Sequence, residues 1–201
     1  KYAIDTYPNS TLGVQNGTSW SLNLDGAYAY AEEGSLQAYV TQQNSQRNLL
    51  DSSNGPGVNT GNQGWLNNLT NTTTTIGIGV KQGGLMSGKL TLSGDATYSK
   101  ASTYYTTTPY TSAACSNTNA ICGMLPTIAN NLGILKLGGI YQLDKNQKLG
   151  LNYWYQLLHS NDYVYNPYQF GWGASGMMPT NQVNPSYNVS VIMANYTYSF
   201  D

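Results

Sequence analysis

Two cysteines are the side chains of this 201-residue chain with the most distinctive chemistry. Cys115 and Cys122 have six residues between them, in a stretch rich in Asn, Thr and Ser. This spacing is neither CxxC nor CxxCH, so it supports neither a redox dithiol nor covalent haem attachment. We predict a structural disulfide that pins an exposed loop in an oxidising compartment. Two free thiols and a metal site are the alternatives.

Other side chains that carry out catalysis in proteins do not form a catalytic pattern in this sequence. His159 is the only histidine, and we expect it to be a solvated loop residue, not a triad member or a metal ligand. Asp25 and Asp95 form a possible carboxylate pair, but their spacing equally fits ordinary polar lining. Gly77 and Gly79 flank Ile78 without a following helix, so they are no phosphate loop. We predict no enzymatic activity.

The carboxylates in the predicted loops are possible calcium ligands, because hard cations prefer oxygen donors. They do not recur in an acidic loop pattern, so we predict no metal site and no cofactor held by this chain. These carboxylates are Asp5, Asp51, Asp144 and Asp162.

The composition excludes several classes of protein. The chain has 8 basic and 9 acidic residues, far below the roughly 25% charge of soluble domains. The net charge of −1 gives no signal for nucleic acid. No apolar run is long enough for a transmembrane helix. The first residues do not read as a signal peptide, and we expect either a removed leader or a longer parent chain.

Hydrophobic residues instead alternate with polar ones, which indicates strands with two different faces. The last segment is an example: Ile192, Ala194, Tyr196, Tyr198 and Phe200 share one parity, and polar residues share the other. An apolar strand face that ends in aromatics is typical of outer-membrane barrels at the lipid–water boundary. We predict seven strands. They cover 18–31, 35–47, 73–81, 89–104, 130–143, 148–158 and 186–200.

The connections between these segments alternate in length. Short ones are predicted at 32–34, 82–88 and 144–147, and long ones at 48–72, 105–129 and 159–185. Outer-membrane barrels sort their connections in this way, with short periplasmic turns and longer external loops. The fold class we predict is therefore all-β, an antiparallel transmembrane β-barrel with an up-and-down meander. A periplasmic C-terminus would place every long loop outside.

Mid-strand charges follow the same alternation. Asp25, Lys81, Lys89, Asp95 and Lys136 all have the polar parity, where they avoid lipid. Lys100 breaks the parity, and we place it at a strand end. Bacterial single-chain barrels have an even number of strands. An odd count of seven therefore predicts either that an N-terminal portion is missing or that one more strand lies within residues 1–16. We favour the missing portion, because residues 1–16 have the composition of a loop.

The polar parity defines a candidate lumen face that carries many small side chains. Small residues allow close approach by another backbone, which favours a barrel that encloses a plug or a partner protein. The residues predicted to form this lumen and partner interface are Ser21, Asn23, Asp25, Gly77, Gly79, Lys81, Thr91, Ser93, Asp95, Thr97, Lys136, Asn152, Trp154 and Gln156.

Four groups of segments carry a family resemblance. They are 5–8 before Leu12-Gly13; Trp65 ahead of 76–80; 149–155 before Asp162-Tyr163; and 185–189 before 196–200. In order and style these segments resemble the C-terminal part of the MtrB/PioB family of decahaem-associated outer-membrane porins. The chain departs from the family in ending at Asp201 instead of Phe, and in lacking the CxxC that some members carry in their N-terminal part.

The resemblance implies a barrel of about two dozen strands in the outer membrane of a Gram-negative bacterium. Residues 1–201 would be the C-terminal part of that single domain. The barrel would enclose a periplasmic multihaem c-type cytochrome in its lumen, and the external loops would accept an extracellular cytochrome. All haem would belong to the partners, since no CxxCH occurs here. A general diffusion porin or solute channel is one alternative. A secreted β-rich adhesin or surface-layer domain is another.

Overall fold

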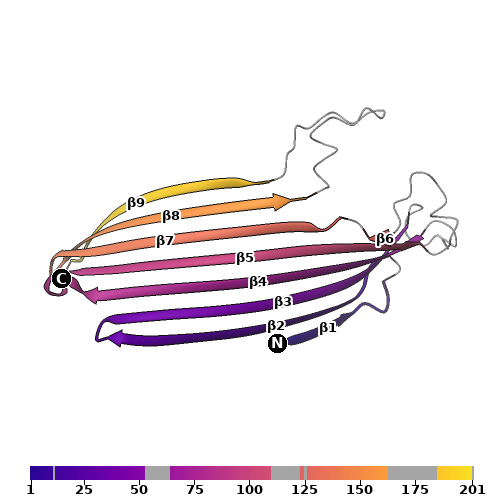
Figure 1. The fold of residues 1–201 in the computed structure, drawn as a ribbon, viewed down its shortest axis with the longest axis horizontal. Helices are drawn as coiled ribbons and strands as arrows, with labels where there is room; N and C mark the ends of the chain where they lie inside the picture. The colour runs from indigo at the N-terminus through magenta and orange to yellow at the C-terminus, as the bar shows by residue number, and fades with distance from the viewer. Residues whose placement is uncertain (11, 53–63, 110–122, 125, 163–184, 201) are drawn as a thin grey trace, which may run out of the picture.

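One antiparallel sheet makes up the computed structural model, which describes residues 1–10, 12–52, 64–109, 123–124, 126–162 and 185–200. The strand order is β1-β2-β3-β4-β5-β7-β8-β9, an up-and-down meander, and β6 pairs with β5 (Figure 1). The elements are β1 (Tyr2–Thr6), β2 (Gly13–Ala31), β3 (Gly34–Ser52), β4 (Gly64–Gly84), α1 (Leu85–Gly88), β5 (Leu90–Pro109), β6 (Gly123–Met124), β7 (Ile128–Asp144), β8 (Gln147–Asn161) and β9 (Tyr187–Tyr198).

The short connections lie together at one end of the sheet, and the strand ends from which the long connections start lie at the other (Figure 1). Glu32-Glu33 and Lys145-Asn146 are tight turns, while α1 is a single turn with left-handed backbone. Met86 and Ser87 have φ of 51° and 61°, which L-residues adopt uncommonly. The predicted sorting of connections by length is confirmed. Among the described residues, no helix is long and apolar enough to cross a membrane.

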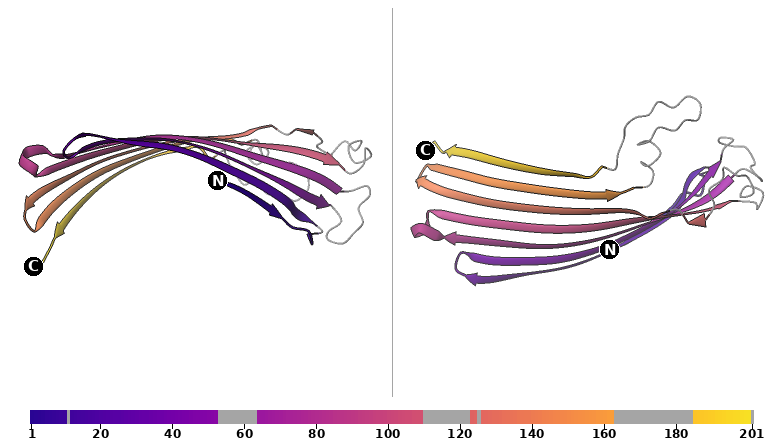
Figure 2. Two further views of the ribbon diagram at one scale, coloured as in Figure 1. Left: turned by 90° about the horizontal axis from the view of Figure 1, so that it is seen from below. Right: turned by 45° about the horizontal axis from the view of Figure 1, so that its top comes forward.

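The register between strands confirms the predicted alternation. Leu24 lies opposite Val40, which lies opposite Ile76. One position along, Asp25 lies opposite Tyr39 and Gly77. Since directly paired residues of antiparallel strands project from the same face, apolar positions share one face and polar positions the other. We call these the apolar face and the polar face. Figure 2 shows that the sheet is bowed and twisted.

The described residues contain no buried hydrophobic side chain. Leu24, Leu151 and Ile192 are 69%, 59% and 74% exposed. A soluble β-sandwich buries such residues between two sheets, and in the described part of the chain there is no second sheet. The apolar face therefore has no covering within this sheet, as expected of a surface that meets lipid.

Several predicted boundaries were wrong. Residues 2–6 form β1, which was assigned to a loop, so the unseen strand is present and the meander has eight strands plus the short β6. The outer parts of the predicted loops also belong to strands, because β3 runs to Ser52, β4 begins at Gly64 and β5 runs to Pro109. These segments are rich in Asn and Thr on both faces. Without an apolar parity they give no period-two signal.

Two single-residue predictions also need correction. Lys100 lies inside β5, opposite Thr74 and Asn131, and not at a strand end. His159 lies within β8, opposite Asn131, and not in a loop. Both errors have the same cause, since the strands continue well beyond their apolar segments.

Candidate functional site

The predicted lumen residues all lie on the polar face. One register row joins Gly79, Asp95, Lys136 and Trp154 across β4, β5, β7 and β8. A neighbouring row joins Lys81, Ser93, Gly138 and Asn152. The other predicted members pair within the same face: Ser21 with Gln43, Asn23 with Thr41, Asp25 with Tyr39, Gly77 with Thr97, Thr91 with Ile140, and Gln156 with Ile134.

Side-chain hydrogen bonds connect the polar face on β2 and β3. Asn23 Nδ2 donates to Asp25 Oδ1 at 2.8 Å, and Thr41 Oγ1 donates to Asn23 Oδ1 at 2.5 Å. Across β4 and β5, Thr75 and Ser99 hydroxyls are hydrogen-bonded to each other. These exposed or half-buried groups satisfy part of their hydrogen-bonding capacity among themselves and leave the remainder for water or a polar partner surface.

Two of the predicted glycines are covered by neighbouring side chains. A Cβ added to Gly77 would lie 2.3 Å from Tyr39 Cε1, so the Tyr39 ring occupies the space over this glycine. The Tyr39 hydroxyl then reaches Thr97 Oγ1 at 3.3 Å. Gln37 covers Gly79 in the same way. Aromatic rings laid over strand glycines support a sheet, which gives these glycines a structural role within it.

Opposite charges line a hollow on the polar face that is about 380 Å³ in volume. Asp95 and Lys136 are direct register partners, and Lys136 Nζ lies 5.9 Å from the centroid of the Trp154 ring. The two charges offset each other, so the described polar face has no ring of like charge at this level. Ion-selective pores commonly use such rings. The hollow is better suited to a surface of mixed polarity than to a selected ion.

We expect a small but measurable coupling between Lys136 and Trp154. Lys136→Met and Trp154→Leu should each destabilise the sheet slightly, and a double-mutant cycle should give about 0.5–1 kcal/mol of coupling, as for exposed cation–π pairs. Urea unfolding of the protein in lipid vesicles measures it. A coupling of zero would mean that the ring and the ammonium do not interact in the folded barrel.

Apolar residues on the polar face were missed by the sequence analysis. Ile140, Val189 and Met193 are 51%, 45% and 48% exposed. Register assigns them to this face: Ile140 pairs with Thr91, Val189 with Gln156, and Met193 with Asn152. In the first half of β9, over residues 188–191, Val189 and Val191 lie on the polar face, and Asn188 and Ser190 lie on the apolar face. This is the reverse of the pattern at the aromatic end of the strand. The aromatic residues at the end of β9 give the stronger alternation, so sequence parity alone does not reveal the exchange.

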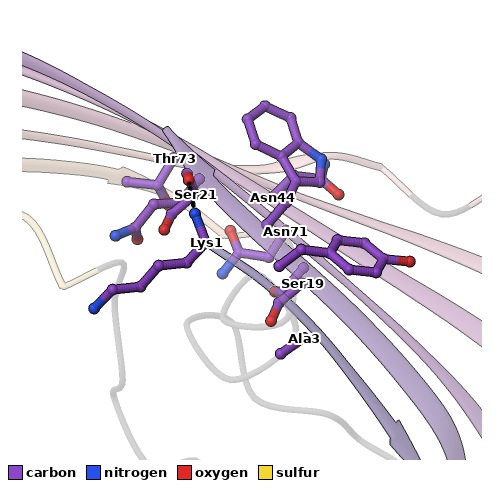
Figure 3. Close-up of a pocket in the computed structure, with 11 residues that line it drawn as sticks. Lys1, Ala3, Ser19, Ser21, Asn44, Asn71 and Thr73 are labelled. Carbon is purple, nitrogen blue, oxygen red and sulfur yellow. Dashed lines mark hydrogen bonds between the residues drawn. The ribbon is translucent and has the colours of Figure 1, made fainter. Parts of the chain in front are cut away.

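A second hollow, of about 580 Å³, lies at the edge of the sheet beside β1 (Figure 3). Lys1, Ser19, Ser21, Asn71 and Thr73 contribute to it, and the Lys1 amino group donates to the Ser21 carbonyl at 2.7 Å. Apart from Lys1, its polar groups are neutral amides and hydroxyls. In the described residues no three His, Cys, Asp or Glu side chains come together as a metal site.

The predicted disulfide between Cys115 and Cys122 lies outside the described residues. It stays a prediction of the sequence.

An antiparallel meander with one apolar face, one polar face and connections sorted by length defines an outer-membrane β-barrel protein. The sequence profile of a family described as "outer membrane beta-barrel porin, MtrB/PioB" matches residues 1–200. The chain belongs to this family, which confirms the resemblance and places the protein in the outer membrane. Porins are a non-enzymatic class. No curated protein matches the chain.

Proposed function

We propose that this chain contributes part of a barrel that encloses a multihaem c-type cytochrome and separates its haems from lipid during electron transfer across the outer membrane. The observation that carries this proposal is the set of exposed apolar side chains on the polar face. The barrel would supply a scaffold, and the partner would supply every redox group.

A lumen filled with water should be lined by polar side chains, as in porins. On β7 to β9, however, Ile140, Val189 and Met193 project from the polar face with about half of their surface exposed. Covering such side chains with protein removes apolar area from water and gains roughly 25 cal/mol per Å². A protein that occupies the lumen would therefore be stabilised along these strands.

We infer that the sheet is closed into a barrel by further strands. In the described chain β1 and β9 are the ends of the strand order and are not paired with each other. Unpaired backbone groups at a sheet edge are not tolerated in hydrocarbon. Additional strands joined to both edges would satisfy them, with residues 1–201 as one part of a single barrel domain.

A general diffusion porin is the second candidate. The hydrogen-bonded side chains on β2 and β3, around Asn23 and Asp25, favour it because they resemble a hydrated lining. The two candidates differ in what fills the lumen. In the sheath, a partner of fixed stoichiometry covers the apolar side chains on β7 to β9, and small solutes do not pass.

The test is purification of the full-length protein from its native outer membrane, followed by haem staining and a solute-flux assay in liposomes. We expect a haem-containing partner at constant stoichiometry and little flux while the partner is bound. Solute flux through a barrel isolated without any partner would instead support the porin. An extracellular cytochrome on the external loops would be found as a second haem protein, removable by surface proteolysis.

A pair of variants links this result to the polar face. Val189→Glu combined with Met193→Glu should release the cytochrome, because it replaces the two exposed apolar side chains of β9 on the polar face with carboxylates. Asn195→Glu is the matched control, since it lies on the same strand and the same face but replaces a polar residue. Retention of the partner by the double variant would contradict the proposed contact, provided that the barrel still shows the gel mobility of the folded form.

A further inference from the structure

Apolar side chains cover only part of the apolar face. They form a continuous stretch on each strand, followed on β2 to β5 toward the long connections by residues that are mostly polar on both faces. We call this set of stretches the lipid band. It comprises 2–4 of β1, 20–30 of β2, 36–40 of β3, 76–80 of β4, 90–98 of β5, 135–141 of β7, 149–157 of β8, and 192–200 at and beyond the end of β9.

The lipid band crosses the strands obliquely. On β9 it begins at Ile192, whose register row runs through Tyr153, Leu137, Gly94, Val80 and Leu36 to Tyr28. On β2 it begins at Trp20, eight residues before Tyr28. On β3, β4, β5 and β8 the border lies on a single row, at Val40, Ile76, Tyr98 and Leu157, so the shift occurs toward the two ends of the sheet. Averaged over the six strand-to-strand steps from β2 to β9, it corresponds to a strand tilt of about 40°, with 3.3 Å per residue and 4.8 Å between strands. Transmembrane barrels have this tilt.

The thickness of the lipid band agrees with the same geometry. From Trp20 to Tyr30 the band spans about 33 Å along the strand, or about 25 Å along the membrane normal at that tilt. The apolar zone of outer-membrane barrels is about 25 Å tall. On β2, therefore, the band defined by residue type and the tilt defined by register agree. On β3 and β4 the apolar stretches 36–40 and 76–80 are shorter, and polar residues adjoin them.

Aromatic residues lie at both borders of the lipid band, on β2 and β5 at one and on β9 at the other. Trp20 and Tyr98 lie at the border toward the long connections, and the Tyr98 hydroxyl donates to Asn131 Oδ1 at 3.2 Å. At the opposite border Tyr198 and Phe200 meet edge to face, with ring centroids 4.7 Å apart. Lys100 lies two residues beyond Tyr98 on the same face. The band therefore ends in interfacial residues before the first charge appears.

Beyond the lipid band, β3, β4 and β5 continue for about ten residues each, over 41–50, 66–75 and 99–108. We call these ranges the polar wall. Asn, Gln, Ser and Thr fill most of its positions on both faces. Asn44 Nδ2 donates to Thr72 Oγ1 at 2.9 Å on the apolar-parity face, and Thr107 Oγ1 donates to Asn67 Oδ1 at 2.9 Å on the opposite face.

We propose that hydrocarbon covers only the lipid band, and that the polar wall stands out of the bilayer by about 25 Å on the side of the long connections. Both faces of the polar wall would then contact water or protein. Placing its amide and hydroxyl side chains in hydrocarbon would be costly without any compensating apolar area. This inference rests on the outer-membrane location and is independent of what occupies the lumen.

The experiment measures labelling of single cysteines by a membrane-impermeant maleimide in native outer-membrane vesicles. The background is Cys115→Ser with Cys122→Ser, and urea-denatured protein gives the maximum. Gln46→Cys and Thr70→Cys, in the polar wall, should label about tenfold or more faster than Leu92→Cys in the lipid band. If Gln46→Cys and Thr70→Cys were protected from the maleimide as fully as Leu92→Cys, the whole sheet would be embedded in the membrane. That result would overturn the proposal.

The oblique course of the lipid band has its own test on one register row. Leu22 and His159 lie on the same row, joined through Gln42, Thr74, Lys100 and Asn131. We expect Leu22→Cys to be protected and His159→Cys to be labelled. Equal labelling of the two would contradict the tilt. If a cysteine variant does not assemble, the same position is replaced by lysine and the yield of folded protein is measured. We expect this yield to be unchanged for lysine at positions 46 and 70, and to be lost for lysine at position 22.

Discussion

Leu151→Arg should destabilise the folded protein by about 1–3 kcal/mol, between the cost of an Arg side chain at the bilayer midplane and its smaller cost near the interface, because Leu151 lies two residues inside the border of the lipid band. Leu151 lies in the lipid band on β8 and is 59% exposed in the isolated sheet. Hydrocarbon is therefore the environment of this side chain in the membrane. Urea unfolding in lipid vesicles, followed by tryptophan fluorescence, measures the change.

The matched control is the adjacent residue. Asn152→Arg introduces the same side chain one position along β8, on the polar face, in the hollow that also contains Asp95. We expect a change within about 0.5 kcal/mol, as for surface substitutions. Equal losses of unfolding free energy at positions 151 and 152 would mean that the two faces of β8 lie in similar environments. The assignment of lipid to the apolar face would then be wrong.

Gly77→Ala should destabilise the protein by about 1–3 kcal/mol, the usual cost of forcing extra volume into a packed position. The new Cβ would lie 2.3 Å from Tyr39 Cε1, so the ring must move and its hydroxyl must leave Thr97. The same unfolding assay measures the loss. Adding Tyr39→Ala to Gly77→Ala should remove most of the clash and give a strongly non-additive cycle.

Gly26→Ala is the control for backbone effects. Gly26 also lies inside a strand, but nothing is within 4 Å of the position of its added Cβ. Replacement of a strand glycine at an open position should be neutral or stabilise the protein by up to about 1 kcal/mol. A similar loss at both glycines would show that the Tyr39 ring is not the cause.

Much of the architecture was predictable because period-two alternation is strong wherever one strand face meets lipid. In the stretches 20–30, 90–98 and 149–157 every second position is apolar or glycine, most of them Leu, Tyr or Trp, and the structure places these positions on a single face. The sorting of short and long connections was equally visible. Neither signal depends on tertiary contacts, since both come from the two solvents that the sheet separates.

Strand ends were harder to predict, for a physical reason. In 66–75 nearly every residue is Asn or Thr, so neither face has a hydropathy signal, and backbone pairing alone defines the strand. β1 is only five residues long and was missed among turn-forming neighbours. Asn and Gly favour turns in isolation, and pairing with an adjacent strand overrides that preference.

For the candidate interface, the sequence predicted which residues lie on the polar side of the sheet but not how their side chains contact one another. Parity alone places Gly77 and Gly79 on the polar face. It does not show that Tyr39 and Gln37 fold over them, because that contact depends on cross-strand register. Val189 and Met193 required the same information, since they become part of the polar face only through their pairing with β8.

The absence of a buried core among the described residues has a consequence for biogenesis. In water, collapse of this chain would not sequester its leucines and tyrosines, so the aqueous state has little thermodynamic reason to be ordered. Ordering and membrane entry should thus be one coupled event. Before that event the chain would need a chaperone to hold it, since exposed strands rich in β-branched and aromatic residues otherwise aggregate.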